Sequence, residues 1–244
     1  NFLFVDGRYV EQAKIQAGKK FKIFEIPKKL PYQILNSRLN LGFDPTVFTS
    51  RSLIYFFRNK IKLTPITKII INSDILKNYT SRKFYSLNPK VVGETVNSKI
   101  KRLIQILKKD RSDYIFISAP ENVAWLLNIR GKDNPFSPLP NCRVIISTKG
   151  EVSFFSDIKK STNIFKKKSF LRISFYKENQ IESFLGRLKS KKIIIDKNSC
   201  PALLENLISS RLKISKIGDP LYLMKSIKNK VEINKTIESH IHDG

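Results

Sequence analysis

The stretch that says most about the fold is ENVAWLLNIRGKDNP, residues 121–135. It contains Trp125, the only tryptophan of the chain, inside an apolar run. The apolar residues from Val123 to Leu127 stand at the spacing of neighbours on a helix, which predicts a short buried helix. Gly131 and Pro135 then end that helix and turn the chain into a loop. Taken alone, the pattern predicts a well-packed helix followed by an ordered loop.

On either side of this stretch, segments with strand and helix patterns alternate. An apolar stripe predicts a helix from about Glu94, with its Lys and Arg residues on the opposite face. The stripe consists of Val96, Ile100, Leu103, Ile104 and Leu107. Pro120 stands where the first turn of the next helix tolerates proline, and Lys149-Gly150 indicates a hairpin.

The expected strands and helices cover most of the chain. Strands are expected at residues 2–5, 21–26, 39–43, 68–71, 113–118, 143–148, 151–156, 171–176, 192–196 and 212–217. Helices are expected at about residues 9–17 and 50–58, from 94 and from 120, and at 178–189 and 201–211, with an extended linker at 72–89. Such alternation favours an α/β fold over an all-α or all-β fold.

A weak internal repeat supports two α/β units. Residues 39–57 and 191–209 both run from a strand through an aspartate, Asp44 or Asp196, into a helix. Helix capping by the aspartate, or by a nearby Ser or Thr, is sufficient to explain the pattern. The repeat therefore suggests a duplication without establishing one.

The composition indicates a folded chain with no membrane segment. Of 244 residues, 41% are hydrophobic and 17 are Phe, enough for real cores. No apolar run approaches the roughly 18 residues of a membrane span. Cys142 and Cys200 lack the spacing of a metal site, which favours two buried thiols in a reducing cytoplasm. Because the chain opens inside a strand pattern and ends inside a helical one, we expect a fragment.

The net charge of +26 raises the alternative of a nucleic-acid-binding protein. However, the basic residues are mostly Lys and are spread along the whole chain, with short clusters such as Lys166–Lys168. A protein that follows a phosphate backbone more often gathers basic and aromatic side chains on one face. The abundance of Ile, Asn and Lys is also the bias expected of AT-rich codons, so no specific nucleic-acid partner is expected.

Asp6-Gly7-Arg8-Tyr9 follows a strand, a usual place for functional loops in α/β units. A cation at a helix start gains nothing from the helix dipole. Arg8 could therefore bind a carboxylate or carbonyl through its forked donors. It could equally form a salt bridge with Asp6 or Glu11. The residues alone leave the two interpretations even.

Other catalytic patterns are not apparent. The chain has no Gly-rich phosphate loop, no Gly-x-Ser-x-Gly elbow and no Cys/His cluster. Its two histidines, His240 and His242, lie at the C-terminal end. Residues two apart face away from each other on a helix, so neither a metal site nor a histidine-based catalytic centre is predicted from them.

Three segments together resemble the N-terminal region of X-Pro aminopeptidases (aminopeptidase P), which are creatinase-like metallopeptidases. The first is Phe4-Val5-Asp6-Gly7-Arg8-Tyr9, similar to the family's [Trp/Phe]-x-Asp-Gly-Arg-Tyr. The second, residues 124–138, resembles Ala-Trp-Leu-[Leu/Phe]-Asn-[Ile/Leu]-Arg-Gly-x-Asp and the Asn-Pro that follows. The third, residues 225–243, resembles Lys-x-x-Lys-Asn-x-x-Glu followed by Ala-His-Ile-[Arg/Lys]-Asp, with His242 where Arg or Lys is customary.

The resemblance implies an architecture of two creatinase N-terminal-like (ribonuclease H-like) α/β domains with mixed sheets. Residues 1–89 would form a truncated first domain and residues 90–219 a complete second domain. Residues 220–244 would form the linker and first helix of a missing pita-bread catalytic domain. Trp125 is expected in the core.

The resemblance also implies a cytoplasmic enzyme that releases the residue before proline, with peptides carrying proline at the second position as substrates and a homodimer as a further option. Arg8 would contact bound peptide. Arg130 and Asp133, on a loop that faces the cleft in relatives, would more often lock that loop than bind substrate. Two Mn(II) ions would activate water, held by ligands downstream of this chain. The fragment alone is therefore expected to hold no metal and no catalytic residue. The competing hypothesis is a non-catalytic binding module, either half of a pseudo-enzyme or a basic nucleic-acid adaptor.

Overall fold

The computed structural model describes residues 1–66, 82–161, 164, 172–188 and 191–244. The chain divides into two compact units, Asn1–Ile71 and Asn72–Gly244. The division falls before the boundary at 89/90 expected from the sequence, because residues 84–87 pack and pair within the second unit. The strand expected at 68–71 and most of the expected linker, 72–81, lie outside the described residues.

The first unit contains two pairs of parallel strands. β1 (Phe2–Asp6) pairs with β2 (Lys22–Ile26), and β3 (Asn40–Phe43) pairs with β4 (Lys62–Pro65). The connecting helices are η1 (Gly7–Tyr9) and α1 (Val10–Gln16), then α2 (Pro31–Ile34) and α3 (Ser50–Phe57). Three expected strands and both expected helices are thus present, and β4 is an additional strand.

The second unit is built on a mixed sheet of six strands in the order β10-β9-β8-β6-β11-β12. The central strand β8 is antiparallel to both of its neighbours, β9 and β6. On one side of the sheet, β10 is parallel to β9. On the other side, β6, β11 and β12 run parallel to one another. The strands are β6 (Tyr114–Ile117), β8 (Cys142–Ser147), β9 (Val152–Ser156), β10 (Ile173–Tyr176), β11 (Lys192–Ile195) and β12 (Lys213–Ile214). The α/β class with a mixed sheet is confirmed.

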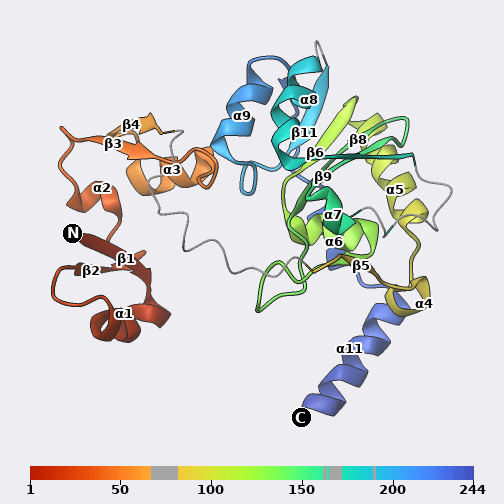
Figure 1. Ribbon diagram of the computed structural model, residues 1–244, viewed down its shortest axis with the longest axis horizontal. Helices are drawn as coiled ribbons and strands as arrows, with labels where there is room; N and C mark the ends of the chain where they lie inside the picture. Colours follow the sequence, from red (N-terminus) through yellow and green to blue (C-terminus); the bar gives the residue numbers. More distant parts are fainter. Residues whose placement is uncertain (67–81, 162–163, 165–171, 189–190) are drawn as a thin grey trace. The chain divides into compact units, whose positions relative to one another are not determined.

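The helices of this unit lie on both faces of the sheet (Figure 1). In chain order they are α4 (Pro89–Val92), α5 (Val96–Lys109), α6 (Pro120–Leu127), α7 (Ile158–Ser161), η3 (Glu178–Gln180), α8 (Ile181–Arg187), α9 (Ala202–Ser209), α10 (Leu221–Ser226) and α11 (Lys230–Asp243). Residues of α5, α6 and α10 enter the core on one face, and residues of α8 and α9 enter the core on the other. Among the described residues, none of these helices is long and apolar enough to cross a membrane.

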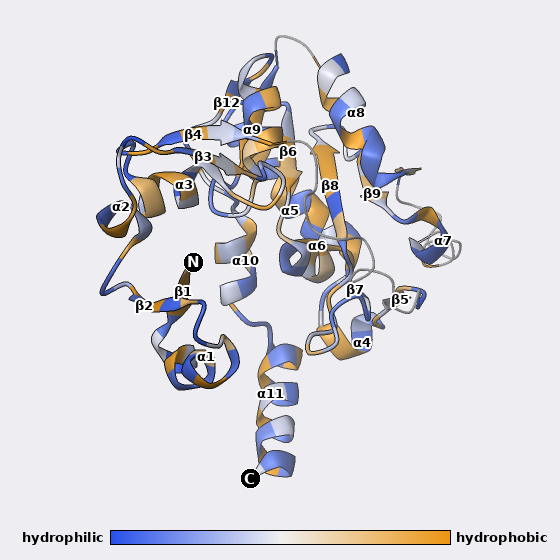
Figure 2. Cartoon of the chain, turned by 60° about the vertical axis from the view of Figure 1, so that its left-hand side comes forward, coloured by the Kyte–Doolittle hydropathy of each residue, from blue (hydrophilic) through white to orange (hydrophobic). Residues whose placement is uncertain are grey.

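The side chains of successive strand residues point to opposite faces of the sheet and fill two hydrophobic cores. Ile115 and Ile117 of β6 pack with α5 and α6, whereas Phe116 between them packs with α8 and α9. This division follows from the opposite directions of successive side chains in a strand. Both faces of the central strands are therefore apolar. In Figure 2, the orange of hydrophobic residues covers β6 and part of β8.

The described end of the segment expected to be a linker, residues 82–89, contributes structure to the second unit. Phe84 is buried in the core, and β5 (Tyr85–Ser86) pairs with β7 (Ile129–Arg130), which directly follows α6. The C-terminal part also differs from a plain linker, because Leu221 and Met224 of α10 enter the same core. Short apolar segments between polar residues lacked the periodicity needed to predict either element.

Candidate functional site

The motif around Trp125 forms a capped, buried helix, as predicted. Pro120 occupies the first turn of α6, and Asn128 ends the helix in the left-handed conformation, with φ 53°. Val123 and Leu126 are fully buried. Trp125 differs from the prediction in part, because its ring packs on the core but remains half-buried at the rim.

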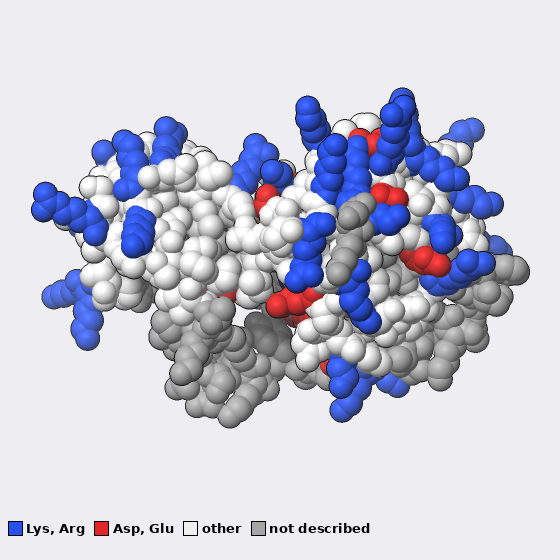
Figure 3. Space-filling model, turned by 90° about the horizontal axis from the view of Figure 1, so that it is seen from above, with Lys and Arg blue, Asp and Glu red and all other residues white. Residues whose placement is uncertain are grey.

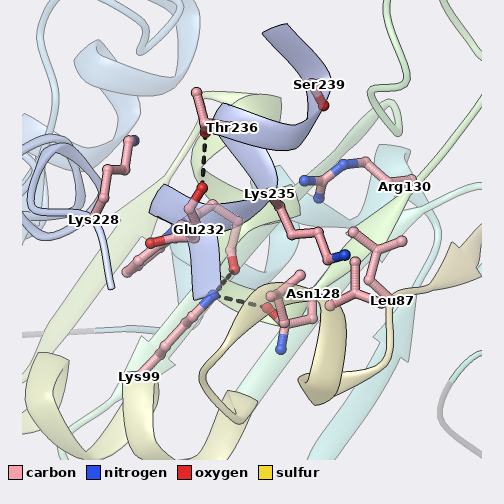
Figure 4. Close-up of a pocket in the computed structure, with 12 residues that line it drawn as sticks. Leu87, Lys99, Asn128, Arg130, Lys228, Glu232, Lys235, Thr236 and Ser239 are labelled. Carbon is pink, nitrogen blue, oxygen red and sulfur yellow. Dashed lines mark hydrogen bonds between the residues drawn. The ribbon is translucent and has the colours of Figure 1, made fainter. Parts of the chain in front are cut away.

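A buried lysine from the neighbouring helix completes the end of α6. Lys99 of α5 is 1% exposed, and its Nζ donates hydrogen bonds to Trp125 O and Asn128 Oδ1, both at 2.8 Å. The same Nζ lies 4.0 Å from the centroid of the Trp125 ring, and Asn128 Nδ2 donates to Glu94 O at 2.9 Å. Figure 4 shows Lys99 reaching these acceptors from below the pocket. The lysine therefore adds a second, shorter hydrogen bond to a carbonyl in the last turn of the helix, which Asn128 N contacts at 3.4 Å.

Burial lowers the pKa of Lys99 to about 8, although Glu232 and Glu94 oppose the shift. The expectation that all Lys and Arg of α5 face away from its apolar stripe is wrong for this residue. Lys99 lies three residues after Val96 and four before Leu103, so its position on the apolar face was visible in the sequence. Lys99 was nevertheless assigned to the polar face because its side chain is charged.

The first turn of α11 is fixed to this cluster. Asn229 caps α11 by accepting from Glu232 N at 2.9 Å, and Glu232 Oε2 accepts from Asn229 N at 2.9 Å. This is a reciprocal capping box. The two side chains also reach outward: Glu232 Oε1 accepts from Trp125 Nε1 at 3.2 Å, and Asn229 Nδ2 donates to Val92 O at 2.9 Å. A helix cap thus serves as the attachment of α11 to α4 and α6.

A pocket of about 460 Å³ lies beside this junction (Figure 4). Its lining combines an apolar wall, several cations, one carboxylate and two hydroxyls. The lining residues are Leu87, Val91, Val92, Lys99, Trp125, Asn128, Arg130, Lys228, Glu232, Lys235, Thr236 and Ser239.

The two loop residues singled out from the sequence have different surroundings. Arg130 lines the pocket and donates from Nη1 to Ile129 O at 2.8 Å and to Ala124 O at 3.3 Å. Asp133 accepts from Asn141 N at 2.7 Å and pairs with Lys160 Nζ at 2.6 Å. These contacts are those of a residue that holds the loop.

The loop is also closed by tight backbone packing. Gly131 is buried, and a Cβ at this position would lie 2.6 Å from Pro140 Cα. Only glycine allows the two strands of the loop to approach so closely. The glycine that the sequence marked as a helix stop is therefore also needed for the shape of the loop.

Arg8 lies in the first unit, where it forms the local ion pair considered from the sequence. Its Nε donates to Asp6 Oδ1 at 2.9 Å, and its hydrogen bond lowers the pKa of Asp6. The Arg8 side chain is 79% exposed. The pair leaves one edge of the guanidinium facing solvent.

Sequence reasoning missed a second buried polar cluster, where α10 meets α6. Asn122 Nδ2 donates to Asp219 Oδ2 at 2.7 Å, and Lys225 Nζ donates to Asn122 Oδ1 at 2.6 Å. Burial raises the pKa of Asp219. Asn122 belongs to the motif but is 97 residues from Asp219, so only the tertiary fold reveals the contact.

Metal binding finds no support in these groups. In the part of the chain that the structure describes, no three His, Cys, Asp or Glu side chains come together to hold a metal ion. His240 and His242 are exposed on α11, and both cysteines are buried and free. The described residues do not fit the dinuclear centre that the resemblance implies.

Comparison with known proteins gives a family profile and a set of relatives that agree with each other. The profile of the Creatinase/Prolidase N-terminal domain family matches residues 77–232. Xaa-Pro aminopeptidase 1 of Dictyostelium discoideum is 31% identical over 171 residues, 69% of this chain and 27% of that protein. Xaa-Pro aminopeptidase ApepP of Drosophila melanogaster is 28% identical over 267 residues, 99% of this chain and 42% of that protein. The chain thus spans less than half the length of these curated relatives.

Among solved structures, X-prolyl aminopeptidase from Caenorhabditis elegans matches with a TM-score of 0.84 and 21% identity, covering 99% of this chain and 43% of that chain. That protein is described as a cytosolic enzyme with a dinuclear active site. The match confirms the creatinase-like α/β fold. With the family profile covering more than half of its length, the chain belongs to the creatinase/prolidase N-terminal domain family, as a relative of the X-Pro aminopeptidases (aminopeptidase P).

Proposed function

We propose that this chain is the peptide-positioning N-terminal part of a metal-dependent X-Pro aminopeptidase, which releases the N-terminal residue before proline. The observation that carries the proposal is the contact between two motifs that resemble the family independently. Trp125 of one donates to Glu232 of the other across 107 residues of sequence. A fold in which both motifs serve one junction is expected if the chain preserves the family's architecture.

The junction has a mechanical role in this proposal. The capping box of α11 fixes the start of the helix, and the contact with Trp125 fixes its direction relative to α6. By the resemblance, α11 is the first helix of the catalytic domain, with residues 220–229 as its linker. The second unit would therefore hold that helix in place and restrict the cleft beside it.

Arg8 is the proposed substrate contact. Its exposed guanidinium offers two parallel donors to a peptide carbonyl or carboxylate. Because Asp6 pairs with its other edge, the side chain is oriented in advance of binding. Arg130 and Asp133 are proposed to shape the loop, which requires no contact with the peptide.

We further propose that the catalytic metal ligands lie outside this chain and that the chain alone does not cleave peptides. Support comes from the alignments, which cover only 27% and 42% of the two aminopeptidases compared above. Two divalent ions, manganese being the expected metal, would supply an activated water when bound. A cytoplasmic location and a homodimer are proposed from the resemblance.

A nucleic-acid adaptor is less well supported. Figure 3 shows Lys and Arg side chains scattered over the visible face, with carboxylates among them. Several basic residues are paired, as Lys192 is with Asp110 at 2.9 Å. Such a distribution favours weak contact with polyanions over a defined binding stripe.

The test is Mn-dependent hydrolysis of an X-Pro-Pro peptide by the full-length product of this gene, with Arg8→Ala beside it. Loss of a charged hydrogen bond predicts a fall in kcat/KM of about 10- to 100-fold. Arg38→Ala removes another exposed arginine of the same unit and is expected to leave kcat/KM unchanged. An unaltered melting temperature in both variants would exclude misfolding as the cause.

Each result has a distinct meaning. Cleavage that is insensitive to Arg8→Ala would keep the peptidase and remove Arg8 from its site. Absence of cleavage by a folded, metal-supplied product would favour the non-catalytic binding module. Cleavage by residues 1–244 alone would refute the proposal that the metal ligands lie elsewhere.

A further inference from the structure

The pocket beside α11 is strongly cationic. Lys99, Arg130, Lys228 and Lys235 line it, and Glu232 is its one acidic lining residue. That carboxylate is already occupied, since its two oxygens accept from Trp125 Nε1 and Asn229 N. The lining therefore carries an excess of positive charge with no free carboxylate to balance it.

Arg130 is a half-buried cation of this lining that has no carboxylate partner among the described residues. Burial lowers its pKa. Among the residues that the structure describes, its hydrogen-bond partners are the carbonyls of Ala124 and Ile129, and it forms no ion pair with a carboxylate. A guanidinium taken partly out of water is costly unless an anion meets it.

A second cation lies across the pocket on α11. Figure 4 shows the Lys235 side chain extending toward the same side of the pocket as Arg130 and Asn128. Lys235 also contacts Glu238 at 2.5 Å, but both side chains are about half exposed. Such surface pairs contribute little and exchange readily with another anion.

The remaining lining is suited to an organic molecule. Val91 and Val92 of α4, with Leu87, form an apolar wall, and Thr236 and Ser239 line the space from α11, where the Thr236 hydroxyl donates to Glu232 O at 2.8 Å. The volume of about 460 Å³ is that of a small-molecule site. Most of the lining residues are polar or charged, so the apolar wall is one side of a mainly polar pocket.

We propose that this pocket binds a small organic oxyanion, with a carboxylate or phosphate group held between Arg130 and Lys235 and an apolar body against Val91 and Val92. Binding would connect β7, α4 and α11 through one ligand and so strengthen the attachment of α11. The inference does not depend on the proposed peptidase activity, because it rests on the charge, volume and lining of the pocket, and binding can be measured without catalysis.

Trp125 provides the measurement, since it lines the pocket and is the only tryptophan. The full chain is titrated with inorganic phosphate, acetate and 4-methylpentanoate at constant ionic strength while tryptophan emission is recorded. Saturable binding of at least one probe is expected, with 4-methylpentanoate tighter than acetate if the apolar wall takes part. Phosphate against the two carboxylates separates the two possible head groups.

Two substitutions test the assigned contacts. Arg130→Gln and Lys235→Gln are each expected to weaken binding about tenfold, the effect of one charged hydrogen bond. Lys101→Gln, an exposed lysine of α5 outside the pocket, is the control for net charge and should leave affinity unchanged. If Arg130→Gln disturbs the loop, Lys235→Gln decides, because its side chain lies on an exposed helix face.

Two results would overturn the proposal. One is the absence of saturable binding for all three probes. The other is equal weakening by Arg130→Gln, Lys235→Gln and Lys101→Gln, which would show a general response to net charge.

Discussion

Replacing Gly93 with alanine should release α11 from the second unit. Gly93 ends α4 with φ +75°, and a Cβ there would lie 2.1 Å from Asn229 Oδ1 and 2.6 Å from its Cγ. No real Cβ contact is this short, so the side chain of Asn229 must leave its position. Asn229 is the residue that caps α11 and donates to Val92 O.

The expected cost has a backbone part and a contact part. A left-handed alanine costs about 1 kcal/mol or somewhat more. Loss of the helix cap costs about 1 kcal/mol, and loss of the hydrogen bond to Val92 costs about 1 kcal/mol more. Gly93→Ala should therefore destabilise the second unit by roughly 3 kcal/mol, of which about 2 kcal/mol concern α11 alone.

Gly150→Ala is the matched control. Its φ of +79° imposes the same backbone strain, but the nearest atom to its Cβ is Ile104 Cδ1 at 3.4 Å, the end of a flexible side chain. It should cost only the backbone part. Hydrogen exchange of the α11 amides and the emission of Trp125, which contacts Glu232, report the release directly.

The comparison can refute the reasoning. If the two variants lose equal stability in denaturant unfolding, and α11 exchanges equally fast in both, Asn229 does not hold this helix. Asn229→Ala offers an independent check, because it removes the two contacts without straining Gly93. It should cost about 2 kcal/mol.

Three further outcomes are expected. Because the folded pKa of Lys99 is lowered to about 8 from 10.5, its burial cost is fully present below pH 8. Stability should therefore rise by up to about 3 kcal/mol as pH increases through 8 toward 10.5, and urea unfolding of Lys99→Met should lack this increment. Asp133→Asn should cost about 1–2 kcal/mol by leaving Lys160 unpaired, with faster proteolysis of the loop after β7; unchanged proteolysis would contradict this role. Trp125→Phe keeps a ring but removes the donor to Glu232, so α11 should be less protected from hydrogen exchange by about 1 kcal/mol, and full protection would show that this bond does not hold the helix.

The sequence predicted those elements whose local pattern agrees with their burial. The helix from Pro120 to Leu127 and the strands β6, β8 and β11 combine strong periodicity with clear start and stop signals. Short elements were missed because two to four residues carry no period. For β5, pairing with β7 decides the structure, and that partner is more than 40 residues away in sequence.

The candidate site shows a different limit. Arg130 and Asp133 could be selected from their motif, but their roles depend on partners that only the fold supplies. Lys99 was overlooked because a lysine on an apolar stripe is normally exposed. It is buried here because a carbonyl, an amide oxygen and an aromatic face converge on its ammonium group.

The family pattern Lys-x-x-Lys-Asn-x-x-Glu acquires a physical explanation from these contacts. Lys225 donates to Asn122 of α6, and Lys228 donates to Lys225 O at 2.5 Å, bracing the turn before α11. Asn229 and Glu232 then cap α11 and bind α4 and α6 respectively.

Each specified residue of that pattern therefore makes a contact that attaches or orients α11. Among the described residues, none of them belongs to a group of side chains that could hold a metal ion. The helix α6 supplies partners to the pattern from two positions three residues apart, Asn122 and Trp125, which lie on one face of a helix. The two motifs thus form the two sides of one junction. Substitutions on either side should weaken the same helix attachment, and combined substitutions should be less than additive because they remove a shared contact.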